Sequence, residues 1–319
     1  MQVLIITNRC NFKCRHCIRE GATSEDLDHA LLRDALPVLR ASGVRRLILT
    51  GGEPILHPRF ETIVDLLVSG GFELGVVSNG WYYRRYLELL RPFRKQIAYL
   101  ALSLDSHRAD EHDRVRARRG SYDRVFEAID AFQQAGYRVH ISHILNRRTA
   151  KDLFAFSDLL VDRSVHLNVG TVIPAQGNEA WRLQPDQRAL LGFTLALMHR
   201  RWGKRLTITT SLGLGHQYLF CDNLATMENM AIRYDGDVLF CCDCPNSNRG
   251  AVLGNLADTP LGDILPRFPQ RTGLVLEARL QAMLAGDPEG SNNCAFCNHI
   301  LAATDDAGTS TIEVRKARP

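Results

Sequence analysis

Short apolar runs alternate with amphipathic stretches over the first two-thirds of the chain. Around Ile63 and Leu67, and around Val125, Ile129 and Phe132, apolar residues recur with the i, i+3, i+4 spacing of a buried helix face. Strands that alternate with such helices predict a parallel α/β sheet, open or partly closed into a barrel. The predicted strands are Val3–Thr7, Arg46–Thr50, Glu73–Ser78, Tyr99–Leu104, Tyr137–Leu145 and His166–Val172, and helices are expected near 29–41, 58–70, 82–91, 121–135 and 150–161.

The pattern changes after a further helix expected near 184–201. Residues 206–260 are rich in loop signals and contain a predicted hairpin with its turn at Asp235–Gly236, flanked by the strands Met230–Tyr234 and Val238–Phe240. Another helix is expected near 274–285. We therefore predict a partial barrel over residues 1–204, a small hairpin-and-helix domain over 205–302 and a polar tail over 303–319.

Composition narrows the class of protein. Of the 319 residues, 45% are apolar and 23% charged, which excludes a disordered or fibrous chain. No run approaches the length of a membrane span, and the first residues lack a basic lead and a cleavage site, so we expect a cytoplasmic protein. The net charge is +4, but the densest basic run lacks interleaved aromatic residues, so no nucleic-acid partner is expected; that run comprises Arg114, Arg116, Arg118 and Arg119.

The nine cysteines carry the chemical signal, because thiols in the cytoplasm stay reduced and clustered ones indicate metal binding. Cys10, Cys14 and Cys17 directly follow the first predicted strand with the spacing C-x3-C-x2-C. Three thiolates can hold three corners of a cubane iron–sulfur cluster and leave one iron open to a further ligand. An open metal position is typical of chemistry rather than scaffolding. A zinc loop is the alternative, with His16 as the only nearby fourth ligand.

A second motif, Gly51–Gly52–Glu53–Pro54, follows the second predicted strand. Together with the three cysteines, it resembles the radical S-adenosylmethionine (SAM) superfamily over roughly residues 1–200. The resemblance implies a partial (β/α)6 barrel. It also implies that SAM chelates the open iron through its amino and carboxylate groups. Reductive cleavage of SAM would then yield a 5′-deoxyadenosyl radical, which abstracts hydrogen from an unactivated C–H bond.

The resemblance also implies roles for single residues around SAM. Gly51 and Gly52 would let backbone carbonyls approach the SAM amino group, and Glu53 would add negative charge; Pro54 is the last residue of this cofactor-binding motif. His16 would pack against the adenine, and Arg116 would grip the SAM carboxylate. Ribose or substrate contacts are implied for Ser78, Asn79, Ser103 and Asp105. Each of these residues could instead have no role in binding, as a turn residue, a surface histidine or a solvated arginine.

The remaining cysteines form a second group. Cys221 and Cys241 bracket Gly236 in the pattern C-x14-G-x4-C, and Cys294 and Cys297 follow much later. Four thiolates saturate one cubane, although a structural zinc site uses the same ligands. The spacing resembles the auxiliary-cluster region of the SPASM and twitch subfamilies of radical SAM enzymes. Because no cysteine follows Cys297, the truncated twitch form with one auxiliary cluster is expected.

Cys242 and Cys244 are left over. In sulfatase-maturating relatives, the residue directly after the second auxiliary cysteine is an active-site acid, and here that position is Cys242. A thiol there can donate hydrogen to a carbon radical, as in radical SAM epimerases. Either cysteine could instead be a packing thiol or an alternative ligand.

The sequence thus favours a radical SAM epimerase that acts on a peptide or small natural product, with SAM and two [4Fe–4S] clusters as cofactors. A flavodoxin or ferredoxin is the expected electron donor. The alternatives are a dehydrogenase or cross-linking maturase and, more remotely, a non-catalytic metal-binding protein.

Overall fold

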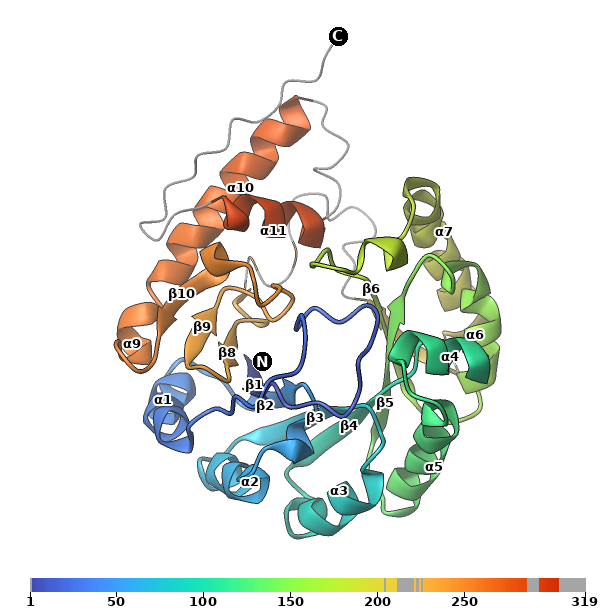
Figure 1. The fold of residues 1–319 in the computed structure, drawn as a ribbon, viewed down its shortest axis with the longest axis horizontal. Helices are drawn as coiled ribbons and strands as arrows, with labels where there is room; N and C mark the ends of the chain where they lie inside the picture. The colour runs from blue at the N-terminus through green and yellow to red at the C-terminus, as the bar shows by residue number, and fades with distance from the viewer. Residues whose placement is uncertain are drawn as a thin grey trace.

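The computed structural model describes residues 2–203, 205–210, 221, 224, 226–285 and 293–303 (Figure 1). Its strands are β1 (Gln2–Thr7), β2 (Arg46–Gly51), β3 (Glu73–Ser78), β4 (Ile97–Ser103), β5 (Val139–Leu145), β6 (His166–Thr171), β7 (Thr207–Thr210), β8 (Ala231–Arg233), β9 (Asp237–Leu239) and β10 (Val252–Asn255). Its α-helices are α1 (His29–Ala41), α2 (Phe60–Ser69), α3 (Tyr83–Leu90), α4 (Ala109–Arg116), α5 (Ser121–Gln134), α6 (Leu153–Leu160), α7 (Pro185–Trp202), α9 (Leu261–Ile264), α10 (Arg267–Leu284) and α11 (Asn293–Ala302).

Short 3-10 segments complete the described elements: η1 (Pro54–Leu56), η2 (Arg91–Phe93), η3 (Ala150–Asp152), η4 (Glu179–Trp181) and η5 (Arg249–Ala251). Within the described ranges, no helix is both long and apolar enough to span a membrane. Residues 304–319, which make up nearly all of the predicted tail, lie outside the described residues.

The described strands form one ten-stranded sheet in the order β10-β9-β8-β1-β2-β3-β4-β5-β6-β7. From β1 to β7 each strand pairs in parallel with the next. Figure 1 shows the connecting helices wrapped around the outside of the curved sheet. All six strands predicted for the barrel are present, with bounds that differ from the prediction by at most two residues. The predicted α/β fold with a partly closed barrel is therefore confirmed.

The C-terminal hairpin continues the same sheet. β8 pairs in parallel with β1, and β9 and β10 follow in antiparallel order. The predicted turn is present, with Gly236 in the left-handed region at φ 86°. At the other edge, β7 adds a parallel strand that the sequence did not predict. Strands on both sides of residue 204 thus belong to one sheet, and the domain division at that residue stays a prediction.

The two faces of β1 bury different clusters. Leu4 and Ile6 point outward and join the main hydrophobic core beneath the helices. Val3 and Ile5 point to the inner side of the curved sheet, because side chains alternate along a strand. There they form a separate apolar cluster, called the inner cluster below, with Ala231, Tyr234 and Leu239.

The inner side is more polar and more open at β5. Ile141, on the outer side, is fully buried, whereas His140 and Ser142, on the inner side, are only half-buried. The inner surface of the sheet therefore passes from a closed apolar end at β1 to an accessible polar region at β5.

Candidate active site and auxiliary metal centre

The triad loop, residues 10–17, leaves the carboxyl end of β1 and carries three half-buried thiols. The backbone N–H of Phe12 donates to the Sγ of Cys10 at 3.4 Å. The backbone N–H of Arg19 donates to the Sγ of Cys17, also at 3.4 Å. Donors aimed at sulfur stabilise the thiolate, which is the form that ligates metal.

The third thiol, of Cys14, has a cationic neighbour. The Nη1 of Arg116 donates to its Sγ at 3.7 Å. Burial nevertheless raises the pKa of Cys14, although Arg116 lowers it. Burial likewise raises the pKa of Cys10 to about 12. These thiols therefore need a nearby positive charge to ionise, and a bound metal provides one.

A cavity of about 310 Å³ opens beside the triad loop. Its walls include Cys14 and Cys17 on one side and Gln176 and Gly177, from the segment after β6, on the other. A small ligand in this cavity would lie against two of the three triad cysteines.

Two glycines at the end of β2 fit closely against the start of the triad loop. A Cβ at Gly51 would overlap the carbonyl oxygen of Thr7, and a Cβ at Gly52 would overlap that of Arg9. The backbone N–H of Gly52 donates to Thr7 at 2.8 Å, and that of Glu53 donates to Arg9 at 2.7 Å. Glycine is therefore required here by the close approach of two backbones, and this contact positions the triad loop.

The Glu53 side chain turns into the core. Its Oε1 accepts hydrogen bonds from Ser78 Oγ at 2.8 Å and from Tyr86 Oη at 2.6 Å. Its Oε2 accepts from the backbone N–H of Asn79 at 2.9 Å. The side-chain amide of Asn79 in turn donates to Asn11 of the triad loop at 2.9 Å. Three sequence-predicted residues thus meet in one network, in which the carboxylate of Glu53 organises the end of β3.

Asp105 follows β4 and is fully buried. Its Oδ2 lies 2.7 Å from the Nε of Arg116 and 3.8 Å from the Nε2 of His16. Its Oδ1 accepts the backbone N–H of Ile144 at 3.0 Å. The structure therefore brings together three predicted SAM-binding residues, beside the triad cysteine that Arg116 contacts. Ser103, also predicted, ends β4 and is half-buried.

Electrostatics keep this network in defined charge states. Burial would raise the pKa of Asp105, but Arg116 and His16 lower it overall, so the carboxylate is ionised. Burial lowers the pKa of His16 to about 4 and that of His112 to about 4, so both imidazoles are neutral near pH 7. The Nδ1 of His112 accepts the backbone N–H of Asp105 at 3.1 Å, which requires that nitrogen to be unprotonated.

The C-terminal cysteines converge from three segments. Cys221 stands before β8, a group of three cysteines follows β9, and Cys294 and Cys297 lie on α11. Burial, together with the neighbouring thiol of Cys221, raises the pKa of Cys297 to about 12. Burial also raises the pKa of Cys294, with contributions from Cys297 and Cys221. Three of the four predicted ligands therefore lie close enough to interact.

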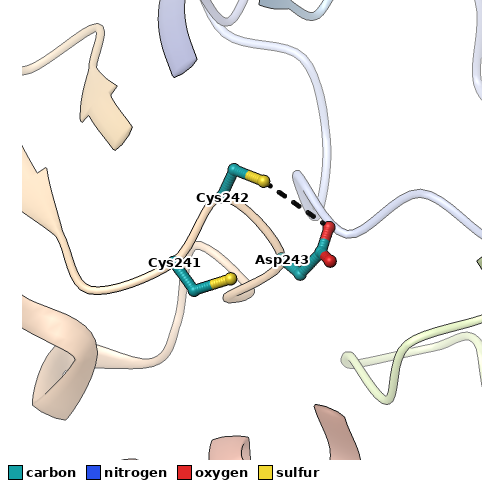
Figure 2. Close-up of side chains that lie close together, drawn as sticks. All are labelled: Cys241, Cys242 and Asp243. Carbon is teal, nitrogen blue, oxygen red and sulfur yellow. Dashed lines mark hydrogen bonds between the residues drawn. The ribbon is translucent and has the colours of Figure 1, made fainter. Parts of the chain in front are cut away.

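The fourth predicted ligand, Cys241, follows β9. Figure 2 shows its thiol beside Cys242, whose Sγ points to Asp243 and donates to Oδ1 at 3.8 Å. The two sulfurs and a carboxylate oxygen of Asp243 lie within 4.8 Å of one another. Cys244 is buried, and the thiols of Cys297 and Cys294 contribute to raising its pKa. The cysteines thus form one connected group.

Two residues just beyond the triad connect its loop to the C-terminal cysteines. The Nη2 of Arg19 donates to the carbonyl of Cys242 at 2.7 Å. The carboxylate of Glu20 accepts from the N–H and Oγ of Ser247, both at 2.7 Å, and from the N–H of Gln176 at 3.2 Å. Sequence reasoning missed Arg19 and Glu20, because their partners lie more than 150 positions away and no local motif signals them.

Comparison with known proteins identifies the combination of a cysteine triad after β1 and a second cysteine group near the C-terminus. Residues 4–160 match the family model of the radical SAM superfamily. The chain belongs to the radical SAM superfamily. Residues 221–298 match the SPASM model, described as an iron–sulfur cluster-binding domain. This second match confirms the auxiliary-cluster domain expected from the spacing of the C-terminal cysteines.

Two curated relatives illustrate the range of this superfamily. GTP 3′,8-cyclase 1 of Pseudomonas aeruginosa is 28% identical over 306 residues, which cover 88% of this chain and 87% of the relative. The antilisterial bacteriocin subtilosin biosynthesis protein AlbA of Bacillus subtilis is 30% identical over 140 residues, or 43% of this chain and 31% of AlbA.

Solved structures share the fold. Streptococcus suis SuiB bound to the precursor peptide SuiA has a TM-score of 0.67 at 16% identity, with 82% of this chain and 63% of SuiB covered. The chain thus spans less than two-thirds of SuiB. Native anSMEcpe with bound AdoMet and Cp18Cys peptide has a TM-score of 0.65 at 16% identity, with 85% and 82% covered.

Membership of this superfamily implies SAM and [4Fe–4S] clusters as cofactors, and the donor sets fit them. The triad loop offers three thiols, each with a hydrogen-bond donor, beside a cavity. The C-terminal group offers four half-buried cysteines from three segments, enough to ligate every iron of a cluster that needs no open position. The assignment of individual ligands and SAM contacts stays a prediction.

Glu53→Gln tests the network at the end of β3. The amide removes the oxygen that accepts from two hydroxyls, or the one that accepts from the backbone N–H of Asn79. If its nitrogen faces the hydroxyls of Ser78 and Tyr86, these must accept instead, and their own hydrogens lose an acceptor. We expect the free energy of unfolding to fall by about 1–3 kcal/mol, measured by urea denaturation. Tyr86→Phe is the matched control, since it removes one donor and leaves the carboxylate, and a smaller loss is expected. Equal stability of Glu53→Gln and wild type would contradict a structural role for this carboxylate.

His112 gives the radical SAM domain a defined sensitivity to acid. In the unfolded chain its pKa is near 6.5, whereas burial lowers it to about 4 in the folded protein. The unfolded state therefore binds protons first, and stability falls as the pH drops from 6.5 towards about 4. Asp105 is ionised throughout this window, and the pKa values of His16 and His143 are also lowered by burial.

His112→Asn, which keeps an acceptor but cannot be protonated, is expected to reduce this loss of stability by about 1–3 kcal/mol. The measurement is urea denaturation across the pH range, with the same substitution at the exposed His199 of α7 as control. An identical pH dependence in wild type and His112→Asn would show that this imidazole does not contribute.

Proposed function

We propose that this radical SAM enzyme abstracts hydrogen from an unactivated C–H bond of a peptide substrate and returns hydrogen from the thiol of Cys242, which makes it an epimerase. One observation carries the proposal. Cys242 packs against the inner cluster on β1, whereas Cys221, Cys241, Cys244 and Cys297 pack within or against the main core. Among these cysteines, Cys242 alone packs against the inner cluster, which lies on the concave side of the sheet.

Two further contacts support Cys242 over Cys244 as the hydrogen donor. Cys242 is half-buried, and its carbonyl is bonded to Arg19, two residues after the last triad cysteine. Cys244 is only 2% exposed and belongs to the main core. A thiol that meets substrate needs access, which favours Cys242. We infer that Cys244 packs the auxiliary site.

The remaining residues divide between two cofactor sites. Cys10, Cys14 and Cys17 would hold the cluster that binds SAM. When bound, SAM and this cluster supply the radical that removes hydrogen from the substrate. The auxiliary cluster would be held by Cys221, Cys241, Cys294 and Cys297. For SAM itself we infer contacts with the residues around the triad loop, namely His16, Gly51, Gly52, Glu53, Pro54, Ser78, Asn79, Ser103, Asp105 and Arg116. At Glu53, whose carboxylate turns into the core, the contact would come from the backbone.

A peptide is the substrate class that the relatives favour. SuiB is described with a precursor peptide, anSMEcpe with a Cp18Cys peptide, and AlbA takes part in the synthesis of a bacteriocin. The half-buried polar side chains of β5 on the inner side would offer hydrogen bonds to a peptide backbone. We further infer a cytoplasmic location, and a flavodoxin or ferredoxin as the electron donor.

Dehydrogenation and cross-linking are the alternative reactions of the same radical, in which no hydrogen returns and Cys242 is dispensable. Anaerobic incubation with SAM, reductant and candidate peptides in deuterated water distinguishes them by the mass of the product. Epimerisation adds one deuterium at the inverted carbon, whereas dehydrogenation or cross-linking makes the product two mass units lighter than the substrate. A parallel reaction with GTP tests the activity named for the relative from Pseudomonas aeruginosa.

A further inference from the structure

A buried arginine on α10 lacks a counter-charge in the described part of the protein. Arg279 is 1% exposed, and its Nε and Nη2 have no hydrogen-bond partner among the residues that the structure describes. No carboxylate among the described residues forms an ion pair with it. A buried charge without a partner is unfavourable, so such a residue indicates an anion that the described residues do not supply.

The neighbours of Arg279 indicate where that anion lies. Burial lowers the pKa of its guanidinium, and the groups that raise it again are the thiols of Cys221, Cys297 and Cys294. The last two are on α11, which contacts α10 and lies beside it in Figure 1. The unpartnered cation is therefore next to three of the predicted ligands of the auxiliary cluster.

We propose that Arg279 is the counter-charge of the auxiliary iron–sulfur cluster and raises its reduction potential. An oxidised cubane with four thiolates is a dianion, and one-electron reduction adds a further negative charge. A fixed cation nearby stabilises the reduced form more than the oxidised form, because the attraction grows with the negative charge. The potential of such clusters depends on the charge and hydrogen bonds around their sulfur atoms.

A guanidinium suits this role better than an ammonium. It stays charged when buried, and its several N–H donors can reach more than one sulfur. Arg279 is thus a positioning and tuning residue, not a catalytic one. The inference rests on the auxiliary cluster and not on the proposed epimerase reaction, so each can fail without the other.

The test is a redox titration in which electron paramagnetic resonance measures the amount of reduced cluster at each potential. It uses the full chain with Cys10, Cys14 and Cys17 replaced by alanine, so that only the auxiliary cluster contributes. At the potential where the cluster of this parent protein is half reduced, Arg279→Gln is expected to lower the ratio of reduced to oxidised cluster about tenfold. For one electron this corresponds to about 59 mV towards more negative potential. Arg279→Lys, which keeps the charge, should shift the ratio less.

Arg267→Gln is the matched control on the same helix, because that arginine is exposed and donates to the carbonyl of Leu253. It should leave the potential unchanged. An unchanged potential in Arg279→Gln with full iron content would overturn the proposal. If Arg279→Gln loses its iron and Arg279→Lys keeps it, the charge is needed for the cluster and the proposal stands. Loss of iron in both variants would show that the arginine serves packing and would also overturn it.

Discussion

Replacing Cys10, Cys14 and Cys17 together by alanine is expected to halve the iron content and abolish SAM cleavage. Three cysteines with one open position and four with none should hold two cubanes, or about eight irons per reconstituted chain. Without the triad about four irons should remain. No SAM cleavage is expected, because the remaining cluster has no open iron to bind SAM. Iron analysis and detection of 5′-deoxyadenosine after anaerobic reconstitution measure the two effects.

The converse variant, with Cys221, Cys241, Cys294 and Cys297 replaced by alanine, is the matched control. It should also retain about four irons, but at the site that binds SAM. Wild-type protein with four irons and one zinc would mean that the C-terminal cysteines form a structural zinc site. That outcome would contradict the auxiliary cluster while leaving the triad intact.

The local spacing of apolar residues was enough to predict the helices and strands that bury one clear apolar face. The bounds of β3 agree with the prediction, since this strand is a short apolar run between turn signals. Helix α4 was missed because, apart from Val115, its side chains beyond the first residue are charged or histidine. Strand β7 was missed because Thr207–Thr210 is four residues long and mostly threonine. Its identity as a strand comes from pairing with β6, which no local pattern encodes.

The residues of the candidate site also fall into those that a local sequence pattern reveals and those that only the fold brings together. Metal-binding cysteines have short spacings that chemistry dictates, so the triad and Cys294–Cys297 could be found from sequence. The partners of Glu53 could not, because Tyr86 lies 33 positions away and its hydroxyl is identified only by the fold. Arg279 had no signal at all, since an arginine on a long helix is normally solvated.

Cys242→Ala is expected to eliminate the epimer while SAM cleavage continues. A carbon radical formed on one face of the substrate inverts only if hydrogen arrives from the opposite face. The thiol supplies that hydrogen and becomes a thiyl radical. One electron from the proposed flavodoxin or ferredoxin, or from the reductant of the assay, and one proton from solvent then restore the thiol. With no hydrogen donor left on that face, epimer formation should fall below detection. Chiral analysis of the product and its deuterium content from deuterated water provide the measurement.

Cys244→Ala is the matched control for this variant, because Cys244 is a neighbouring thiol that is buried in the main core. Its loss should affect stability or iron content rather than stereochemistry. In Cys242→Ala the triad loop is unchanged, so 5′-deoxyadenosine should still form, uncoupled from epimerisation or accompanied by side products of the substrate radical. An unchanged product from Cys242→Ala would contradict the epimerase proposal. A dehydrogenated or cross-linked wild-type product would contradict it as well, and Cys242 would then be a packing residue of the inner cluster.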